Sequence, residues 1–429
     1  MKYALTGCSV IDGTKDCSLR ENCNIFVDGA KIVRITDAAE QIPSDYKTID
    51  LSGKYVMPGL INMHAHLFGT GKPSKSLGGG KSQERLIKFM NSSLGMKVLL
   101  KLVKNSVTTE LNSGVTTVRG VGDLRYSDVI IRDRINAGKM NGPRMLVSGP
   151  AITVPGGHGA GTFAEVGEKP DELRKLVQEH REHGVDFIKI CVTGGVMDAK
   201  KRGEPGELRM NIEQTRAVCD EAHKYGYLVA SHTESPEGVE TDLLGGVDTV
   251  EHGSRLDDKL IALFKEKGAK DICTISAALP LAKLSHEVTQ LNEFTQFNAG
   301  VVMDGIIECA RKCLDNGIPV ALGTDASCTF VSHYNTWMEM YYFIKYVGVT
   351  NAEAIYCGTL RGAEILGIDK ITGSVEEGKC ADLIVLSDDP LEDITTLKHP
   401  EKVIFRGKII DDPKVKRLDV IDKAIEQLV

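Results

Sequence analysis

The sequence lacks any long apolar run, because nowhere do about eighteen apolar residues follow one another without interruption. A helix that crosses a membrane would need such a run, so we predict none. The first residues, MKYALTGCSVIDGTKD, also lack the apolar stretch of a secretory leader. We therefore expect a globular, cytoplasmic protein with no membrane partner.

The chain also lacks a strong charge of one sign. It has 52 basic and 59 acidic residues, a net charge of −7, and no long block of like charge. Binding to nucleic acid or to an anionic membrane surface depends on a concentrated basic patch. Neither class of partner is therefore predicted.

The eleven cysteines show no repeated spacing. An odd number without a pattern indicates free thiols in a reducing compartment rather than a disulfide framework. Cys309 and Cys313 lie one helical turn apart, but a zinc site would want two further ligands at short spacing. We interpret this pair as packing.

What the sequence does contain is an alternation of short β-rich runs with longer stretches of helical periodicity. The helical candidates are 170–183, 211–225, 257–267 and 304–316. Eight strand and helix pairs predict an α/β protein with a closed (β/α)8 barrel. The eight runs are 56–67, 114–123, 144–152, 186–193, 228–233, 249–254, 271–277 and 319–325.

The two ends of the chain have a different texture, with short alternating segments broken by Gly and Asp turns. This predicts antiparallel strands that pair into one small domain. We expect a composite β-sandwich from residues 1–56 and 366–412, a barrel from 57–365, and a C-terminal helix in 413–429. The glycines of 69–84 suggest a lid over the barrel mouth.

Six side chains that can bind or bridge metal ions lie at or near the ends of five of these strands. Barrel enzymes place their chemistry at the carboxyl ends of the strands, so the six are expected to converge. Two imidazoles on alternate residues of the first strand would point to one face. Together the side chains predict a site for two divalent metal ions. They are His64, His66, Lys189, His232, His252 and Asp325.

Lys189 is the unusual member of this group, because an ammonium has no lone pair and would repel metal ions. Carbon dioxide can add to a neutral amine that is desolvated inside a barrel, giving a carbamate with two oxygens for two metals. The alternative is a salt bridge from Lys189 to Asp325 or Asp186.

Several segments resemble the amidohydrolase superfamily: PGLINMHAHL, FIKICVTGGV, SHTES, EHGS, GTDAS and GSVEEGKCADLIVL. The chain is most similar to the imidazolonepropionase-like group that keeps a carboxylated lysine on strand 4. That group includes zinc-dependent Xaa-Pro and Xaa-Arg or Xaa-Lys dipeptidases. The segment after His232, Thr-Glu-Ser, departs from the aromatic-containing segment of those dipeptidases.

The resemblance implies a role for each ligand. His64, His66 and Asp325 would hold a buried zinc ion, His232 and His252 would hold an outer one, and Lys189 would bridge the two as a carbamate. A hydroxide between the ions would attack a carbonyl, and Asp325 would move its proton to the leaving nitrogen.

Four residues are candidates for contacts with the substrate. His158, in TVPGGHGAG after strand 3, resembles a segment that faces the substrate in dipeptidase-like relatives, and we expect it to bind substrate or to stabilise an oxyanion. Arg119 and Tyr126 follow strand 2, and Thr274 follows strand 7, where they could contact substrate groups such as a carboxylate. Each of these three could instead fasten a loop.

The sequence thus predicts a hydrolase of a peptide-like or N-acyl amide bond, of the dipeptidase or carboxypeptidase kind. A hydrolase of cyclic amides, carbamates or aryl ureas remains open, since the metal centre would be the same. A deaminase is disfavoured because Ser235 stands where those enzymes have glutamate. A non-catalytic scaffold is disfavoured because all six positions are filled. We also expect a small-molecule substrate and self-association of the chain.

Overall fold

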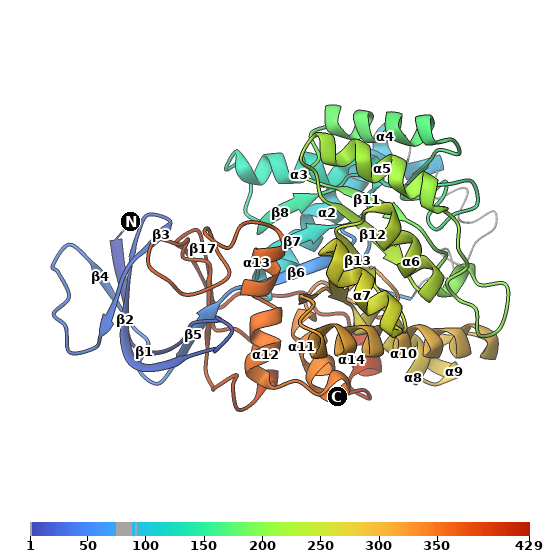
Figure 1. Ribbon diagram of the computed structural model, residues 1–429. Coiled ribbons are helices and arrows are strands. Elements are labelled where there is room, and N and C mark those ends of the chain that lie inside the picture. Colours follow the sequence, from blue (N-terminus) through green and yellow to red (C-terminus); the bar gives the residue numbers. More distant parts are fainter. Residues whose placement is uncertain (1, 74–87, 91) are drawn as a thin grey trace. The chain divides into compact units, whose positions relative to one another are not determined.

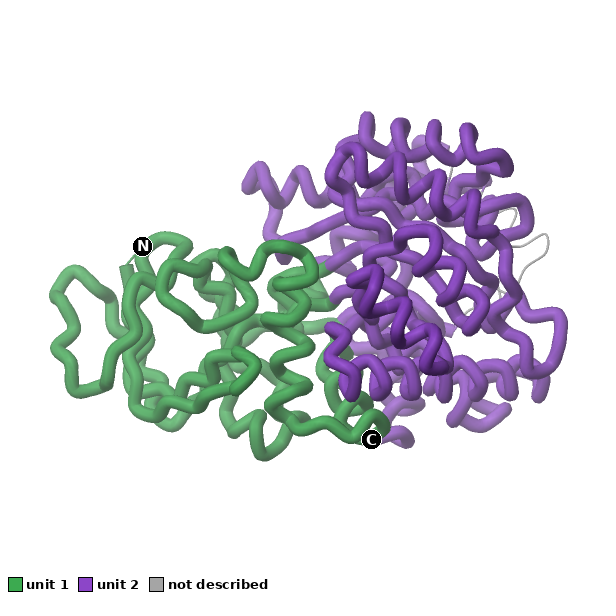
Figure 2. The backbone as a smooth tube through the Cα atoms, viewed as in Figure 1, with its two compact units in different colours: residues 1–62, 108–118, 334–416 green, residues 63–107, 119–333, 417–429 purple. Residues whose placement is uncertain are grey.

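The computed structural model describes residues 2–73, 88–90 and 92–429. Its chain forms two compact units, which Figure 2 shows in different colours. Unit 1 comprises residues 1–62, 108–118 and 334–416, and unit 2 comprises 63–107, 119–333 and 417–429. The domain boundaries expected from the sequence stay a prediction. Of the expected lid, residues 74–84 lie outside the described residues.

Unit 1 is built around a mixed sheet that joins strands from both ends of the chain, in the order β18-β17-β16-β5-β1-β2-β3, with β4 paired to β1. Strands β4 and β5 run parallel to β1, whereas only antiparallel pairs were expected. The antiparallel expectation is wrong there because both strands return to β1 through connections longer than hairpins. The bounds are β1 (Lys2–Ile11), β2 (Leu19–Asp28), β3 (Lys31–Asp37), β4 (Lys47–Asp50), β5 (Tyr55–Pro58), β16 (Leu383–Leu386), β17 (Lys402–Phe405) and β18 (Lys408–Asp411).

The core of this sheet is apolar, with Leu5, Ile25, Val56, Leu383 and Ile404 among its buried residues. Along β1 and β2 buried residues alternate with less buried ones only in part, so the two strands are covered on more than one face. The predicted pairing of N-terminal and C-terminal strands is confirmed by the antiparallel pair of β5 and β16.

The remaining strands form two sheets with the orders β6-β7-β8 and β10-β9-β11-β12-β13-β14-β15. From β9 onward every neighbouring pair is parallel. Their bounds are β6 (Leu60–Ala65), β7 (Val115–Gly120), β8 (Arg144–Val147), β9 (Ala151–Thr153), β10 (Ala164–Val166), β11 (Ile188–Cys191), β12 (Val229–Thr233), β13 (Thr249–His252), β14 (Lys270–Cys273) and β15 (Val320–Leu322).

Backbone contacts join these two sheets. A parallel bridge connects Ala65, at the end of β6, with Ala326 beyond β15. The Asp186 backbone N–H donates to the Val147 carbonyl of β8 at 2.8 Å. Strands β11, β12 and β13 are buried along their whole length, as expected for parallel strands covered on both faces. The arrangement is an α/β fold consistent with the predicted (β/α)8 barrel.

Helices follow the strands, and in Figure 1 α4 to α7 lie outside β11 to β13. The longest, α10, begins eleven residues before the expected 304, because the Asn292 side chain caps it by accepting a hydrogen bond from the Thr295 N–H. The bounds are α2 (Ser93–Asn112), α3 (Ser127–Asn136), α4 (Pro170–Glu182), α5 (Ile212–Lys224), α6 (Pro236–Gly245), α7 (Asp258–Lys267), α8 (Ile275–Lys283), α9 (His286–Thr289), α10 (Glu293–Asp315), α11 (Thr336–Tyr342), α12 (Asn351–Cys357), α13 (Leu360–Ile365) and α14 (Asp419–Ile425).

None of the helices in the described part of the chain combines the length and the apolar character needed to cross a membrane.

Candidate metal centre

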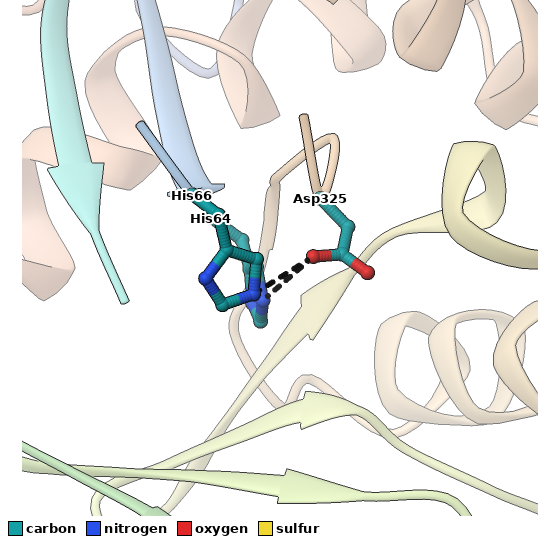
Figure 3. A group of neighbouring side chains, drawn as sticks. All are labelled: His64, His66 and Asp325. Atoms are coloured by element: carbon teal, nitrogen blue, oxygen red, sulfur yellow. Dashed lines mark ion pairs between the residues drawn. The ribbon is translucent and has the colours of Figure 1, made fainter. Parts of the chain in front are cut away.

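Three side chains from the two ends of the barrel sequence converge on one point (Figure 3). His64 lies on β6, His66 directly follows it, and Asp325 follows β15. Asp325 Oδ1 lies 3.4 Å from His64 Nε2 and 3.3 Å from His66 Nε2. Ligands about 2.0–2.1 Å from a tetrahedral zinc-like ion would be about 3.3–3.4 Å apart. These three residues, the first cluster, therefore have the donors and the spacing of a metal site.

The backbone around Asp325 brings it close to His64. Gly323 lies so near that an added Cβ would come within 2.4 Å of the His64 Cβ, so a larger residue would push the two strands apart. Asp325 itself has φ 59°, in the left-handed region. That conformation costs a non-glycine residue about 1–3 kcal/mol and is found where a site requires it. Here it turns the carboxylate toward the two imidazoles.

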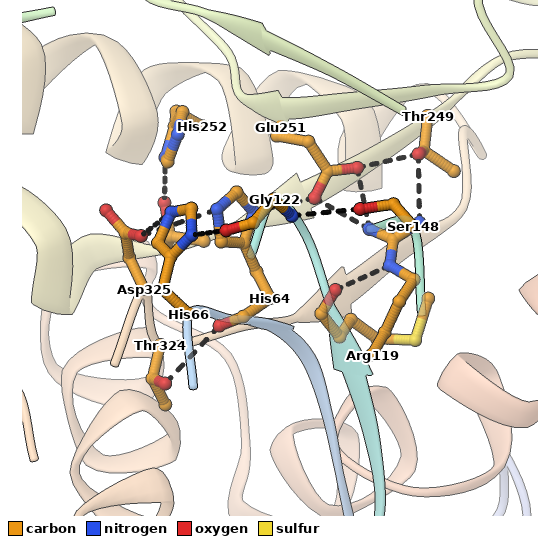
Figure 4. Close-up of polar contacts among 12 residues, drawn as sticks. His64, His66, Arg119, Gly122, Ser148, Thr249, Glu251, His252, Thr324 and Asp325 are labelled. Atoms are coloured by element: carbon orange, nitrogen blue, oxygen red, sulfur yellow. Dashed lines mark hydrogen bonds and ion pairs between the residues drawn. The ribbon is translucent and has the colours of Figure 1, made fainter. Parts of the chain in front are cut away.

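Hydrogen bonds from the barrel interior fix both imidazoles of the first cluster (Figure 4). His64 Nδ1 lies 2.8 Å from Glu251 Oε2, and His66 Nδ1 lies 2.7 Å from the Gly122 carbonyl. A carbonyl can only accept, so the His66 proton is on Nδ1 and the Nε2 lone pair is directed at the cluster. Such bonds to the second ring nitrogen set the tautomer and the ring orientation of metal ligands.

Glu251 is in turn held by Arg119, and both side chains are almost completely buried. Arg119 Nη2 donates to both Glu251 oxygens at 2.6 Å, Nη1 donates to Thr249 Oγ1, and Nε donates to the Met63 carbonyl. Burial acts to raise the pKa of Glu251, but the Arg119 charge and the His64 hydrogen bond outweigh it and lower the pKa. Glu251 is therefore an ionised acceptor for His64.

A second group of donors comprises His232 at the end of β12, His252 at the end of β13, and Glu234. Their ligand atoms all lie within 4.8 Å of one another, and we call them the second cluster. His252 has φ 70°, so the chain turns in the left-handed region as the strand ends. Its ring centroid lies 4.8 Å from that of His64 and 4.7 Å from that of His232. The two clusters are thus neighbours.

Each imidazole of the second cluster has one ring nitrogen near another protein group. His252 Nδ1 lies 2.7 Å from Thr274 Oγ1, and His232 Nε2 lies 3.4 Å from the Gly194 carbonyl. These contacts leave the other nitrogen of each ring as the metal donor. Burial, followed by the neighbouring histidines, lowers the pKa of both His232 and His252. Both rings are therefore neutral, which is the form that binds metal.

Lys189 lies on β11 and is only 1 % exposed. Its Nζ has no hydrogen-bond partner among the described residues. Burial lowers the pKa of Lys189, and its charge is felt by Asp325 of the first cluster and by His232 and His252 of the second. A buried amine without an anionic partner at hydrogen-bond distance among the described residues fits a group that is modified or neutral better than a salt bridge.

His158 is brought to the second cluster, as a site residue should be. Its ring stacks on the His232 ring with centroids 4.2 Å apart and an angle of 6° between the planes. Its Nδ1 is hydrogen-bonded to Asp198, which also accepts from the Gly195 N–H. Asp198 therefore positions His158 over His232.

The other three residues expected at the substrate have protein partners instead. Arg119 is occupied by Glu251, Thr249 and Met63, and Thr274 is held against His252. The Tyr126 ring stacks on His183 at 3.7 Å. Arg119 thus acts on His64 through Glu251, Thr274 contacts His252, and Tyr126 packs against the end of α4. Their contact with substrate stays a prediction.

Sequence reasoning missed Glu234, Glu251 and Asp198. Glu251 immediately precedes His252, and in a strand the two should point to opposite faces, so the adjacency gave no signal for a shared site. The left-handed φ of His252 removes that opposition. Glu234 was noticed only as a departure from a familiar segment. Its position two residues after His232 was the available signal.

A third group, Asp271 with Cys309 and Cys313, is fully buried between β14 and α10. The Cys309 thiol donates to Asp271 Oδ1 at 3.5 Å. Its three donors are one fewer than structural zinc sites use. The interpretation of the two cysteines as packing stays a prediction.

Comparisons with known proteins agree with this site. The profile of the Amidohydrolase family matches residues 55–410. A structure described as that of a candidate prolidase from Bifidobacterium longum has 39 % identity and a TM-score of 0.87, covering 99 % of this chain and 98 % of its own. The structure of a Xaa-Pro dipeptidase with methionine bound in its active site has 30 % identity and a TM-score of 0.82, covering 96 % and 100 %.

A third relative is an ochratoxinase from Aspergillus niger, 24 % identical over 416 residues, which cover 90 % of this chain and 82 % of the relative. The family profile spans well over half of the chain and includes every residue of both clusters. The histidine and aspartate donors of the first cluster form the kind of metal site that is typical of such enzymes. This chain belongs to the amidohydrolase family and is a metal-dependent hydrolase that acts on C–N bonds.

Proposed function

We propose that the protein is a binuclear zinc hydrolase that cleaves a peptide-like or N-acyl amide bond and releases a C-terminal amino acid. One observation carries the proposal: the buried Lys189 amine acts electrostatically on residues of both neighbouring donor clusters and has no hydrogen-bond partner among the described residues. Lys189, carboxylated by carbon dioxide, would supply one oxygen to each cluster.

The bound ions would supply Lewis acidity and a nucleophile at neutral pH, since metal binding lowers the pKa of water to about 7. Asp325 is the residue placed to hold the proton of the attacking water. Its Oδ1 is directed at His64 and His66, and its Oδ2 accepts from the Cys328 thiol at 3.1 Å. We assign the transferred proton to Oδ2, from which it would return to the leaving nitrogen.

The surface beside the clusters supports an apolar substrate group. The Phe163 ring lies 5.2 Å from the His66 ring and 5.4 Å from the His158 ring, and it stacks with Phe68 at 6.0 Å. Both phenylalanines are partly exposed. Such an aromatic wall suits an apolar side chain or a proline ring.

The relatives support the same substrate class. A prolidase assignment and a Xaa-Pro dipeptidase with bound methionine occur among the similar structures at 39 % and 30 % identity. A product site for a free amino acid would fit the release of a C-terminal residue. As a small-molecule enzyme, the protein would need no nucleic-acid or membrane partner, and we retain self-association as part of the proposal.

The test is a substrate panel assayed with zinc and bicarbonate. It contains Xaa-Pro, Xaa-Arg and Xaa-Met dipeptides, N-acyl amino acids, and each dipeptide with its carboxyl group blocked as an amide. Cyclic amides, carbamates and aryl ureas form the second arm. We expect the protein to release free amino acid from the unblocked compounds. The D325N variant is the control and should be inactive. Turnover confined to the second arm would reject the peptidase assignment and leave the metal chemistry standing.

A further inference from the structure

Glu234 belongs to the second cluster and lies in the segment between β12 and α6. Its carboxylate has a ligand oxygen within 4.8 Å of donor nitrogens on both His232 and His252. Its Oε2 is buried and has no hydrogen-bond partner in the part of the chain that the structure describes. A buried carboxylate oxygen without a donor is costly unless a cation or a proton meets it.

The backbone of Glu234 is held rigidly in this position. Its N–H donates to the Thr193 hydroxyl at 3.0 Å, beyond the end of β11. Gly206 packs against it so closely that an added Cβ would lie within 2.5 Å of the Glu234 carbonyl carbon. Ser235, the next residue, caps α6 by accepting from the Gly238 N–H. The backbone around Glu234 is therefore fixed, which keeps its carboxylate close to the second cluster.

The protein supplies little to balance the charge of Glu234. The Val196 backbone N–H acts on the Glu234 carboxylate, but Oε2 has no donor among the described residues. Among the described residues no lysine or arginine forms an ion pair with Glu234. A metal ion held with His232 and His252 would supply the positive charge that this carboxylate lacks.

We propose that Glu234 is a third protein ligand of the outer metal ion, so that the second cluster is a His232, Glu234 and His252 site. This inference rests on the proposed binuclear function and adds a ligand to it. Two histidines with one glutamate are a known donor set of catalytic zinc sites. The extra carboxylate also balances charge, because two divalent cations carry more positive charge than Asp325 and a Lys189 carbamate offset.

A metal ligand at Glu234 would make the outer ion less dependent on Lys189. With only two histidines, an outer ion would depend on the carbamate for a third protein donor. With Glu234, three protein donors remain when the carbamate is removed, which is the number that catalytic zinc sites use. The outer ion should then persist, more weakly, in K189A and be lost in the double variant K189A/E234Q.

The test measures zinc binding and does not depend on turnover. Metal-free protein is dialysed against buffers of fixed free zinc with bicarbonate, and zinc per chain is read by mass spectrometry. The variants are E234Q, E234D, K189A and K189A/E234Q. The matched control is E237Q, because Glu237 is exposed on the first turn of α6, three residues away. Circular dichroism of the metal-free forms checks folding, and E234D keeps a carboxylate if E234Q does not fold.

We expect two zinc ions in the wild type and in E237Q. In E234Q the weaker of the two ions should bind about tenfold or more less tightly, with E234D intermediate and the tighter ion unchanged. Wild-type affinity for both ions in E234Q would overturn the assignment while leaving the binuclear function intact. A wild type that never binds a second ion would overturn both.

Discussion

The two donor clusters differ in how their ligands are held. The first cluster lies on the end of β6 and just beyond β15, and its imidazoles are fixed by Glu251 and Gly122 inside the barrel. The second cluster uses two strand ends and a partly buried glutamate between a strand and a helix. His158, from a glycine-rich loop, stacks on one of its histidines. The first cluster is therefore held by groups inside the barrel, whereas the second cluster also depends on loop residues.

This difference indicates that the two clusters have different roles in the reaction. A cluster buried in the scaffold can keep its metal ion and its proton carrier in fixed geometry, which is where electrostatic preorganisation is most effective. A cluster that includes loop residues can vary with the substrate, because loops carry specificity in barrel enzymes. Changes in the first cluster should therefore reduce activity on every substrate, and changes beside the second should alter selectivity.

The largest effect is expected for Asp325→Asn. The amide keeps the shape but loses the charge that faces His64 and His66 and the site that holds the transferred proton. Loss of a proton carrier alone lowers kcat by about 10²–10⁴-fold. Steady-state kinetics on two unrelated substrates should show the same loss for both. D258N, on the exposed first turn of α7, is the control. Activity within tenfold of wild type would remove Asp325 from proton transfer.

Lys189→Ala should lower kcat/KM by about 10²-fold, because the carboxylate that would join the clusters disappears. Since a small carboxylate can take the same place in the vacated space, added acetate should restore part of the activity of K189A and none of that of D325N. Mass spectrometry of the native wild type should show an added carbon dioxide. Full activity of K189A in bicarbonate-free buffer would contradict the carbamate.

Glu251→Gln sharpens the comparison, because Glu251 is hydrogen-bonded to a ligand of the first cluster, His64. The change leaves the buried Arg119 charge without its carboxylate and weakens the hold on His64 Nδ1. We expect the tighter zinc ion to bind about 10–100-fold less well, with the other ion little affected. Urea unfolding of the metal-free protein should show a loss of about 3–5 kcal/mol. Equal weakening of both ions would show that the clusters are not separately supported.

The smallest effect is expected for a partly exposed histidine–carboxylate pair, in contrast to the buried pair of His64 and Glu251. His223 Nε2 lies 2.8 Å from Asp248 Oδ2, and the His223 side chain is 41 % exposed. The hydrogen bond and charge of Asp248 raise the pKa of His223. Its stabilisation is therefore complete below the unfolded pKa of about 6.5 and disappears as the pH rises through the higher folded value.

Solvent screening limits this contribution to about 0.5 kcal/mol or less. Urea unfolding of H223Q should thus fall slightly below wild type at pH 5.5 and match it at pH 9, with zinc content unchanged at both. A difference that grows with pH would reverse the assigned sign.

Strand periodicity was enough to predict the barrel and the three donors of the first cluster from the sequence. His64 and His66 stand on alternate residues of one strand, and the carboxyl ends of parallel strands must meet at one face. The first cluster is confirmed as a metal site of the family's kind. The apolar neighbours of Lys189 in the sequence were enough to predict that it lies in a buried strand.

The remaining features of the site cannot be predicted from the two-residue periodicity of strands. The left-handed backbones of His252 and Asp325 decide where their side chains point, and nothing in the local sequence marks them. Arg119 lies on β7, and its partner Glu251 lies 132 residues away along the chain. A long-range ion pair of this kind follows from barrel closure and cannot be read from spacing.

Anomalous diffraction at the zinc edge, from crystals grown with zinc and bicarbonate, would locate the metal ions directly. We expect two zinc peaks, one bounded by His64, His66 and Asp325 and one by His232, Glu234 and His252, with density extending from Lys189 Nζ between them. A single peak, or an unmodified Lys189 amine directed away from the metal, would contradict this expectation.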